Sequence, residues 1–108
     1  MILEHALLSV RAGAEANFEA AFAEAKAIIS GMPGFEGLTL SRCLEQPSTY
    51  LLLVRWRLLR DHTEGFRGSA EYERWRALLH HFYEPFPVVE HYEPVSYTHL
   101  TLPTIYSV

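Results

Sequence analysis

The stretch from residue 56 to residue 82 holds the side chains best suited to chemistry. Two of its histidines, His62 and His81, could act as a base or as a hydrogen-bond donor, because histidine titrates near neutral pH. The stretch is also rich in aromatic residues that could form the wall of an apolar pocket: Trp56, Phe66, Tyr72, Trp75 and Phe82. A pocket of that kind needs polar groups to orient its ligand, and the histidines could supply them.

Each of these residues also has a purely structural interpretation. An aromatic stripe at helical spacing is more often part of a core than part of a pocket. His62 follows a residue that could cap a helix, so it could simply be solvated at the start of that helix. His80 and His81 are adjacent and project about 100° apart on a helix, so we expect at most one of them to face inward.

Hydrophobic spacing predicts the elements that must position these residues. Residues 15–30 carry apolar side chains at intervals of three and four, which predicts a helix with one apolar face. Short apolar runs predict four strands, at residues 2–10, 35–44, 50–57 and 88–95.

A second helical region is predicted between the third and fourth strands. Asp61 is expected to cap its first piece, with Glu64 three residues later as in a capping box. Two glycines weaken that piece, and Ser69 is expected to cap the second piece. Pro85 ends the region, because proline cannot continue the backbone hydrogen bonds of a helix.

The predicted order βαββαβ indicates an α+β, ferredoxin-like fold, in which two helices cover one face of a four-stranded antiparallel sheet. The run 50–54 is apolar at both odd and even positions, which is typical of a strand covered on both faces. A second sheet must then cover the face that lacks helices, and a homodimer would supply it.

Length and composition limit the possible classes of protein. The 108 residues suffice for one domain. The net charge of −4 and the single lysine, Lys26, argue against nucleic-acid binding, which depends on neutralising phosphates with basic side chains. A single cysteine, Cys43, excludes an intrachain disulfide and suits a reducing cytoplasm. We predict neither a signal peptide nor a membrane-spanning stretch, and therefore expect a soluble cytoplasmic protein without a membrane partner.

Residues 96–108 differ in composition from the chain before them. They contain no Asp, Glu, Lys or Arg, and the predicted fold is complete at Val95. We interpret residues 1–95 as the domain and residues 96–108 as a non-native or disordered tail, such as read-through of vector sequence. An added strand that pairs with a sheet edge is the alternative.

His5 and His91 lie on strands that should be antiparallel neighbours, so they could sit almost opposite each other, with Glu4, Glu90 and Glu93 nearby. A metal site or a dimer contact would be possible there, but structural pairing is the favoured interpretation. The sequence contains no HxH, HExxH or Cys-His spacing, so we predict no metal. We also predict no nucleotide cofactor, because no glycine-rich loop follows a strand.

Residues 2–95 resemble the antibiotic-biosynthesis monooxygenase domain family. Several short segments in a fixed order carry the resemblance: Val10-Arg11-Ala12-Gly13 followed by Phe18 and Phe22, Met32-Pro33-Gly34-Phe35, Tyr50-Leu51-Leu52-Leu53-Val54-Arg55-Trp56, His62-Thr63-Glu64-Gly65-Phe66-Arg67-Gly68-Ser69, and Val89-Glu90-His91-Tyr92. The resemblance implies a homodimer of the dimeric α+β barrel type with a pocket in each subunit, between the sheet and the helices.

Members of that family oxygenate aromatic phenols, oxidise quinols or cleave haem, and several need no metal, flavin or haem. The haem-cleaving branch uses an asparagine on the first strand. The asparagine here, Asn17, lies on the first predicted helix, and Ala6 takes the equivalent strand position, which argues against haem cleavage.

We therefore expect a monooxygenase that acts on an aromatic phenol or quinol without a cofactor, with His62 or His81 as the base. The alternative is a non-catalytic dimeric module of the same fold that binds a small aromatic molecule, and a purely structural dimer is a third option. An ionisable group that lines the pocket would favour catalysis, and a pocket with only apolar walls would favour binding.

Overall fold

The computed structural model describes residues 1–96 and residue 98, and shows the predicted α+β order of elements. The strands are β1 (Ile2–Ser9), β2 (Phe35–Arg42), β3 (Thr49–Trp56) and β4 (Val89–Tyr92). The helices are α1 (Glu15–Ile29) and α2 (Ala70–Leu79), with a π-helical turn η1 (Asp61–Phe66) before α2 and a 3₁₀ turn η2 (His80–Phe82) after it. The predicted boundaries differ from these by a few residues at most.

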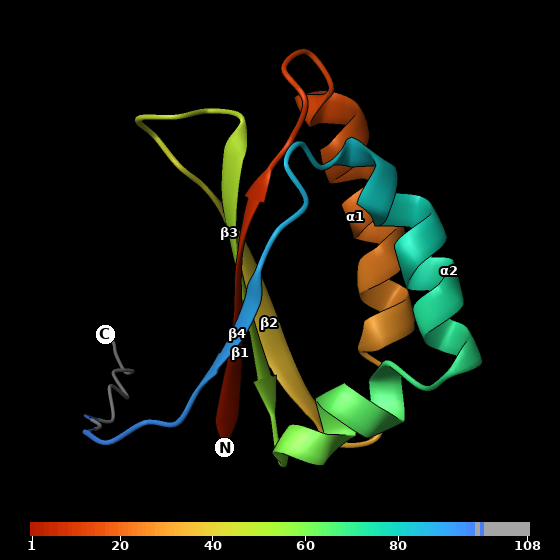
Figure 1. Cartoon of the computed structure of the whole chain (residues 1–108), viewed down its shortest axis with the longest axis vertical. Helices are drawn as coiled ribbons and strands as arrows, with labels where there is room; N and C mark the ends of the chain where they lie inside the picture. Colours follow the sequence, from red (N-terminus) through yellow and green to blue (C-terminus); the bar gives the residue numbers. More distant parts are fainter. Residues whose placement is uncertain (97, 99–108) are drawn as a thin grey trace, which may run out of the picture.

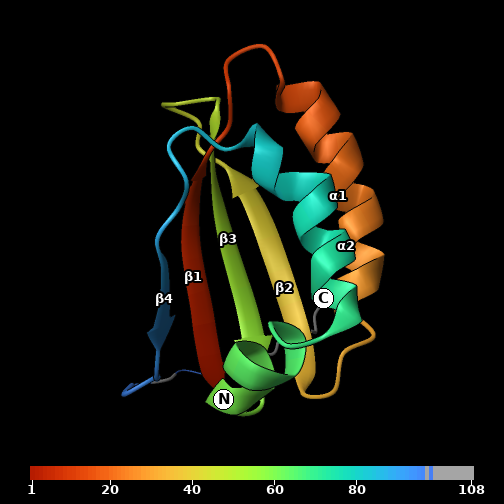
Figure 2. The ribbon, with the colours of Figure 1, turned by 45° about the vertical axis from the view of Figure 1, so that its right-hand side comes forward.

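The four strands form one antiparallel sheet in the order β2-β3-β1-β4. Both helices lie on the same face of this sheet, as Figures 1 and 2 show. The predicted ferredoxin-like topology is thereby confirmed. Within the described residues, no helix is both long enough and apolar enough to cross a membrane.

The core lies between the helices and alternate residues of the two central strands. In β3 the buried residues are every second one, from Tyr50 to Trp56, because successive side chains of a strand point to opposite faces. The helices add their apolar faces: Phe18, Phe22, Ala25 and Ile29 from α1, and Trp75 and Leu79 from α2.

The strand register corrects the predicted pairing of His5 with His91. Across β1 and β4, Glu4 is paired with His91, and His5 is paired with Glu90. The prediction was wrong by one residue, and in a strand one residue changes the face. His5 consequently lies on the open face of the sheet, 3.9 Å from Glu90, whereas His91 lies on the helix face with Glu4.

Only one of the two predicted helix caps is present. Ser69 caps α2, with its Oγ accepting a hydrogen bond from the backbone N–H of Tyr72 at 3.1 Å. Asp61 does not cap η1, and the predicted capping box is wrong. The preceding residue, Arg60, already has helical backbone angles, and the Asp61 carboxylate turns back to accept from the Leu58 N–H at 3.2 Å.

The face of the sheet without helices remains partly exposed. Leu7 is 54% exposed there and lies opposite Leu51, while Leu53 lies opposite His5. The second predicted strand stops at Arg42, and Leu44 beyond it is 87% exposed. The predicted tail falls mostly on residues 97 and 99–108, which lie outside the described residues.

Candidate functional site

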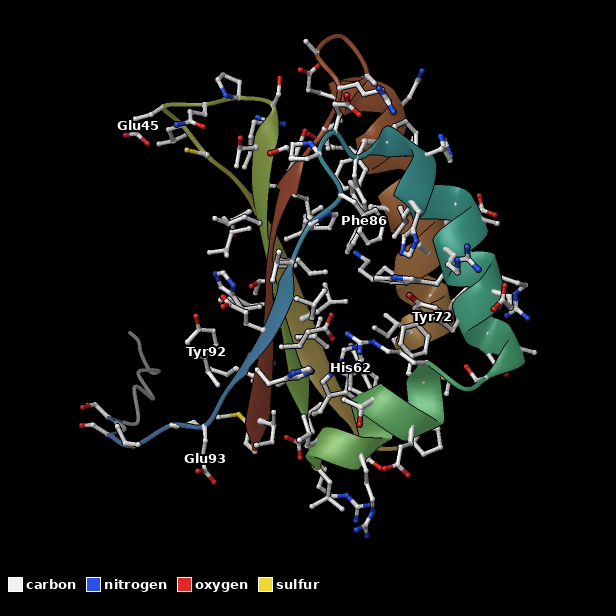
Figure 3. The ribbon with its side chains drawn as sticks, in the orientation of Figure 1. Glu45, His62, Tyr72, Phe86, Tyr92 and Glu93 are labelled. Carbon is white, nitrogen blue, oxygen red and sulfur yellow. The ribbon has the colours of Figure 1, made fainter. Side chains whose placement is uncertain are left out.

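A cavity of about 400 Å³ lies between the sheet and the second helical region. Such a volume is at the lower end of the range for small-molecule sites, about 300–1,000 Å³. Figure 3 shows His62 from η1 and Tyr72 from α2 on the helix side of the sheet, where the cavity lies, and Tyr92 on the opposite side. Its lining includes Glu4, His62, Phe66, Arg67, Tyr72 and Trp75.

A buried carboxyl and a buried imidazole meet at the polar end of this cavity. Glu4 and His62 are 6% and 3% exposed, and Glu4 Oε1 lies 3.3 Å from His62 Nε2. The same oxygen accepts a hydrogen bond from Trp56 Nε1–H at 2.9 Å, and the Trp56 ring stacks on the His62 ring with centroids 5.5 Å apart. Trp56 thus contacts both members of the Glu4–His62 pair, one by a hydrogen bond and the other by stacking.

The other nitrogen of His62 is engaged as well. His62 Nδ1 lies 2.8 Å from His91 Nε2, which is a hydrogen-bond distance. Glu4, His62 and His91 therefore form a continuous chain from the cavity to the half-buried edge strand β4. Both ring nitrogens of His62 have protein partners, whereas only Oε1 of Glu4 is engaged among the described residues.

Burial shifts the pKa of both His62 and Glu4. It lowers the pKa of the His62 imidazole to about 3, with the Arg67 charge and His91 acting in the same direction, so His62 is neutral at neutral pH. Burial also raises the pKa of the Glu4 carboxyl, although the Trp56 N–H and Arg67 partly offset this. The 3.3 Å contact between Glu4 and His62 therefore joins a carboxyl to a neutral imidazole and is not an ion pair.

Two further titratable side chains on the cavity wall are also held neutral. Burial lowers the pKa of His80, and burial raises the pKa of the Tyr83 hydroxyl far above its usual range. Arg67, by contrast, carries a permanent positive charge on the same wall. The lining thus combines aromatic surface with one buried acid–imidazole pair and one guanidinium.

The structure brings together four of the seven predicted site residues. His62, Phe66, Tyr72 and Trp75 line the cavity. Trp56 is fully buried behind the Glu4–His62 pair. The remaining two lie away from the lining: Phe82 packs edge-on against Phe18 of the core, and His81 is exposed next to Phe82.

Four residues of the site were not in the predicted catalytic and substrate-binding set: Glu4, Arg67, His80 and His91. His80, the neighbour of His81, is the one that lines the cavity. His91 contacts His62 because of a strand register that could not be predicted to one residue. The sequence does contain a signal for Glu4: it is an acid at a strand position that shares its face with the buried Ala6 and Leu8.

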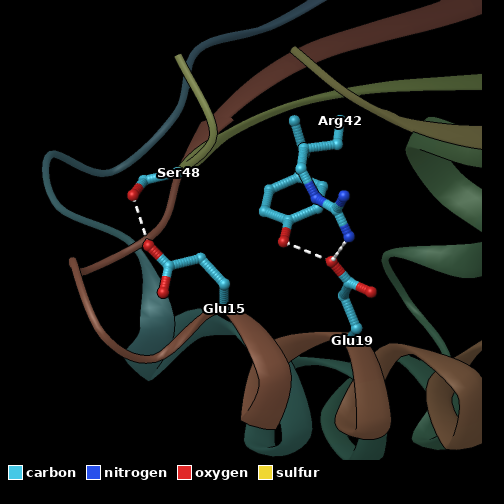
Figure 4. Close-up of polar contacts among 5 residues, drawn as sticks. Glu15, Glu19, Arg42 and Ser48 are labelled. Atoms are coloured by element: carbon cyan, nitrogen blue, oxygen red, sulfur yellow. Dashed lines mark hydrogen bonds and ion pairs between the residues drawn. The ribbon is translucent and has the colours of Figure 1, made fainter. Parts of the chain in front are cut away.

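A second polar cluster lies away from the cavity and ties α1 to the strands (Figure 4). Glu19 Oε2 accepts a hydrogen bond from Tyr50 Oη at 2.6 Å and one from Arg42 Nη2 at 2.6 Å. The Ser48 hydroxyl donates to Glu15 at the start of the same helix. In the part of the chain that the structure describes, no three histidine, cysteine or carboxylate side chains are grouped as metal ligands.

Comparisons with known proteins agree with this architecture. The family model described as antibiotic biosynthesis monooxygenase matches residues 1–78. The uncharacterized protein YczJ of Bacillus subtilis (strain 168) is 56% identical over 95 residues, which are 88% of this chain and all of YczJ.

Solved structures agree as well. A Bordetella bronchiseptica protein assigned to the antibiotic biosynthesis monooxygenases is 36% identical, with a TM-score of 0.83 over 88% of this chain and 97% of its own. SnoaB, a cofactor-independent oxygenase from Streptomyces nogalater, has a TM-score of 0.67 over 95% of this chain and 97% of its own; at 22% identity it shows a shared fold only. Because the family model covers well over half of its residues, the chain belongs to the antibiotic biosynthesis monooxygenase family.

Proposed function

We propose that this protein is a cofactor-independent monooxygenase that oxidises a small aromatic phenol or quinol in the cavity beside α2. The observation that carries the proposal is the buried Glu4–His62 pair at the polar end of a cavity with aromatic walls. Family membership and the fold shared with SnoaB support the reaction class.

The Glu4–His62 pair is the proposed proton acceptor. Because both nitrogens of His62 already have partners, the second oxygen of Glu4 is the atom left to meet a substrate hydroxyl. A carboxyl with a raised pKa is better matched to a phenol than an ordinary surface carboxylate. His62 then acts by orienting Glu4 and sharing its proton.

The substrate itself supplies the electrons in the proposed reaction. Transfer of the hydroxyl proton to the pair leaves a phenolate, which gives an electron to dioxygen, and a C–O bond then forms at a ring carbon. The resulting hydroperoxide loses water and leaves a ring carbonyl. One oxygen atom enters the product, and the other leaves as water with the hydrogens of the original O–H and C–H bonds.

A non-catalytic module that binds a small aromatic molecule is the competing function. For binding alone, a cavity with only apolar walls would suffice. A buried acid next to a buried imidazole costs folding free energy, because each polar group must be removed from water. We therefore favour the oxygenase, in which the pair has a chemical task.

Oxygen uptake by metal-stripped protein, measured against a panel of mono- and dihydroxy-aromatic compounds, tests the proposal. We expect uptake above the protein-free control, reduced about 100-fold or more in Glu4→Gln and in His62→Gln. His81→Ala is the matched control and should retain full uptake, because His81 lies off the cavity. The absence of uptake with every compound, or uptake that both cavity variants retain, would refute the oxygenase.

We also propose that two copies of the chain pair through the open face of the sheet, in the reducing cytoplasm that a lone cysteine suits. Leu7, Leu51 and Leu53 form an apolar strip there, flanked by Tyr92 of β4. A second sheet packed face to face would remove this strip from water. Covering it would also complete the two-sided burial of β3.

A further inference from the structure

We infer that Arg67 is the counter-ion for an anionic oxygen on the aromatic ligand, so that the cavity holds its phenol as the phenolate after the hydroxyl proton has been given up. The inference rests on the proposed function to the extent that it places a phenol in this cavity. It adds the charge state of the ligand and the residue that selects it.

The backbone of Arg67 is anchored next to the buried part of the site. Arg67 directly follows Phe66, which is buried, and its backbone N–H donates to the His62 carbonyl at 3.1 Å as η1 ends. Its side chain lines the same cavity as Glu4 and His62. Arg67 is therefore an exposed residue at the end of the turn that carries His62, and it borders the cavity of the proposed proton acceptor.

The guanidinium of Arg67 has no acceptor among the described residues. Three other arginines have one: Arg11 contacts Glu84, Arg42 contacts Glu19, and Arg76 contacts Glu73. Arg60 and Arg74 also have none among the described residues, but neither of them lines the cavity. Arg67 takes part in none of the ion pairs or side-chain hydrogen bonds that residues 1–96 form. A cavity wall with an unengaged planar donor is suited to a ligand oxygen that bears negative charge.

The charge of Arg67 reaches the polar end of the cavity. It acts on the pKa of Glu4, of His62 and of His91, in each case as a lesser cause after burial. The other titratable groups on the wall are Tyr72, His80 and Tyr83, and none of them supplies a positive charge at neutral pH. Arg67 is therefore the group in the lining that can stabilise the negative charge left on the ligand oxygen once the Glu4–His62 pair has taken its proton.

The test uses 4-nitrophenol, whose phenolate has its own absorbance band and whose electron-poor ring resists oxidation by dioxygen. Absorbance titration of the bound ligand against pH gives its pKa in the complex. An opposite charge at short range lowers the pKa of an acid, and we expect a lowering of about one unit relative to the free ligand, or about tenfold tighter binding of the phenolate.

Three variants separate charge from shape. Arg67→Met keeps the length of the side chain and should lose the shift, whereas Arg67→Lys keeps the charge and should retain most of it. Arg74→Met is the matched control, because Arg74 is an exposed arginine of α2 outside the cavity lining. Thermal unfolding of each variant confirms that the fold is intact.

An equal bound pKa in wild type and Arg67→Met would overturn the inference, as would preferential binding of the neutral phenol or no binding by the wild type. The titration requires no turnover. If it shows the shift while no phenol supports oxygen uptake, the oxygenase proposal fails and the counter-ion role stands. If uptake occurs without the shift, the counter-ion inference fails and the oxygenase proposal stands.

Discussion

His62 and His91 are 29 positions apart in the chain, and their rings meet with Nδ1 of the first 2.8 Å from Nε2 of the second. The contact joins η1 to the edge strand β4, whose pairing partner in the described sheet is β1. It also occupies the nitrogen of His62 that points away from Glu4. The edge strand thus has a part in the site, although its own residues are half-buried or exposed.

Replacing His91 should destabilise the protein because His62 loses a hydrogen-bond partner. In His91→Phe the buried Nδ1 of His62 loses its hydrogen bond, and we expect the free energy of unfolding to fall by about 1–3 kcal/mol. Urea denaturation measures the change. His81→Phe is the control, and because His81 is exposed it should alter stability by no more than about 0.5 kcal/mol. Equal effects of the two substitutions would contradict the role assigned to the contact.

The stability of the protein should fall as the pH is lowered from 6.5 towards 3, in part because of His62. The folded-state pKa of His62 is about 3 against an ordinary 6.5, so in this window the unfolded chain binds a proton that the folded chain does not. Stability therefore rises with pH, by up to about 1.4 kcal/mol per pH unit for one proton.

His62→Gln removes that titration, and unfolding curves recorded across the window should become flatter than those of the wild type. Glu4, whose pKa is raised, acts in the opposite sense, because its contribution is lost as the pH rises through its folded-state pKa. Glu4→Gln separates the two contributions. A wild-type slope that persists in His62→Gln would show that other groups cause it.

Trp75 should matter for stability and for ligand binding together. It is buried, packs edge-on against Phe22 and Phe66, and also lines the cavity. Trp75→Ala is expected to destabilise by about 3–5 kcal/mol. Trp75→Phe keeps most of the packing and should change the affinity for 4-nitrophenol more than it changes the melting temperature. A small loss of stability in Trp75→Ala would mean that the residue serves the cavity and not the core.

A charge on the open face of the sheet should separate the proposed dimer. In Leu7→Glu a carboxylate would be buried in the interface without a partner, so we expect monomers in size-exclusion chromatography with light scattering. Leu44→Glu is the control, since Leu44 is exposed on the loop after β2. A wild-type protein that is monomeric at all accessible concentrations would contradict the dimer outright.

The polar cluster around Glu19 offers a test of specificity. Tyr50→Phe removes the hydrogen bond between Tyr50 and Glu19 and should lower stability, because a buried ring then loses its polar anchor. It should leave the affinity for 4-nitrophenol unchanged, since neither residue lines the cavity. An altered affinity would indicate that the cavity responds to distant changes in packing.

Local sequence patterns were sufficient for the elements and their order. The spacing of Phe18, Phe22, Ala25 and Ile29 predicts α1, and the apolar run 50–54 predicts the strand β3, whose alternate burial only the structure shows. Both patterns depend on residues that are close in the chain, where the geometry of a helix or strand decides which side chains share a face. The α+β class and the ferredoxin-like order follow from them.

The cap at Asp61 shows where local patterns fail. Its sequence context is that of a capping box, yet the backbone is already helical one residue earlier, and the carboxylate bonds to the Leu58 N–H instead. The choice between His80 and His81 failed in a similar way, because the chain leaves the α-helical path at η2 and helical spacing no longer decides which ring faces inward.

The sequence by itself determined the elements, the fold class, the family resemblance and the region of the site, because each depends on residue types at short range. Only the tertiary structure decided that Glu4, His62 and His91 form one chain and that Arg67 shares their cavity. The physical reason is the register of β1 with β4. Pairing across a sheet is set by packing of the whole domain, and a shift of one residue would move His91 to the other face.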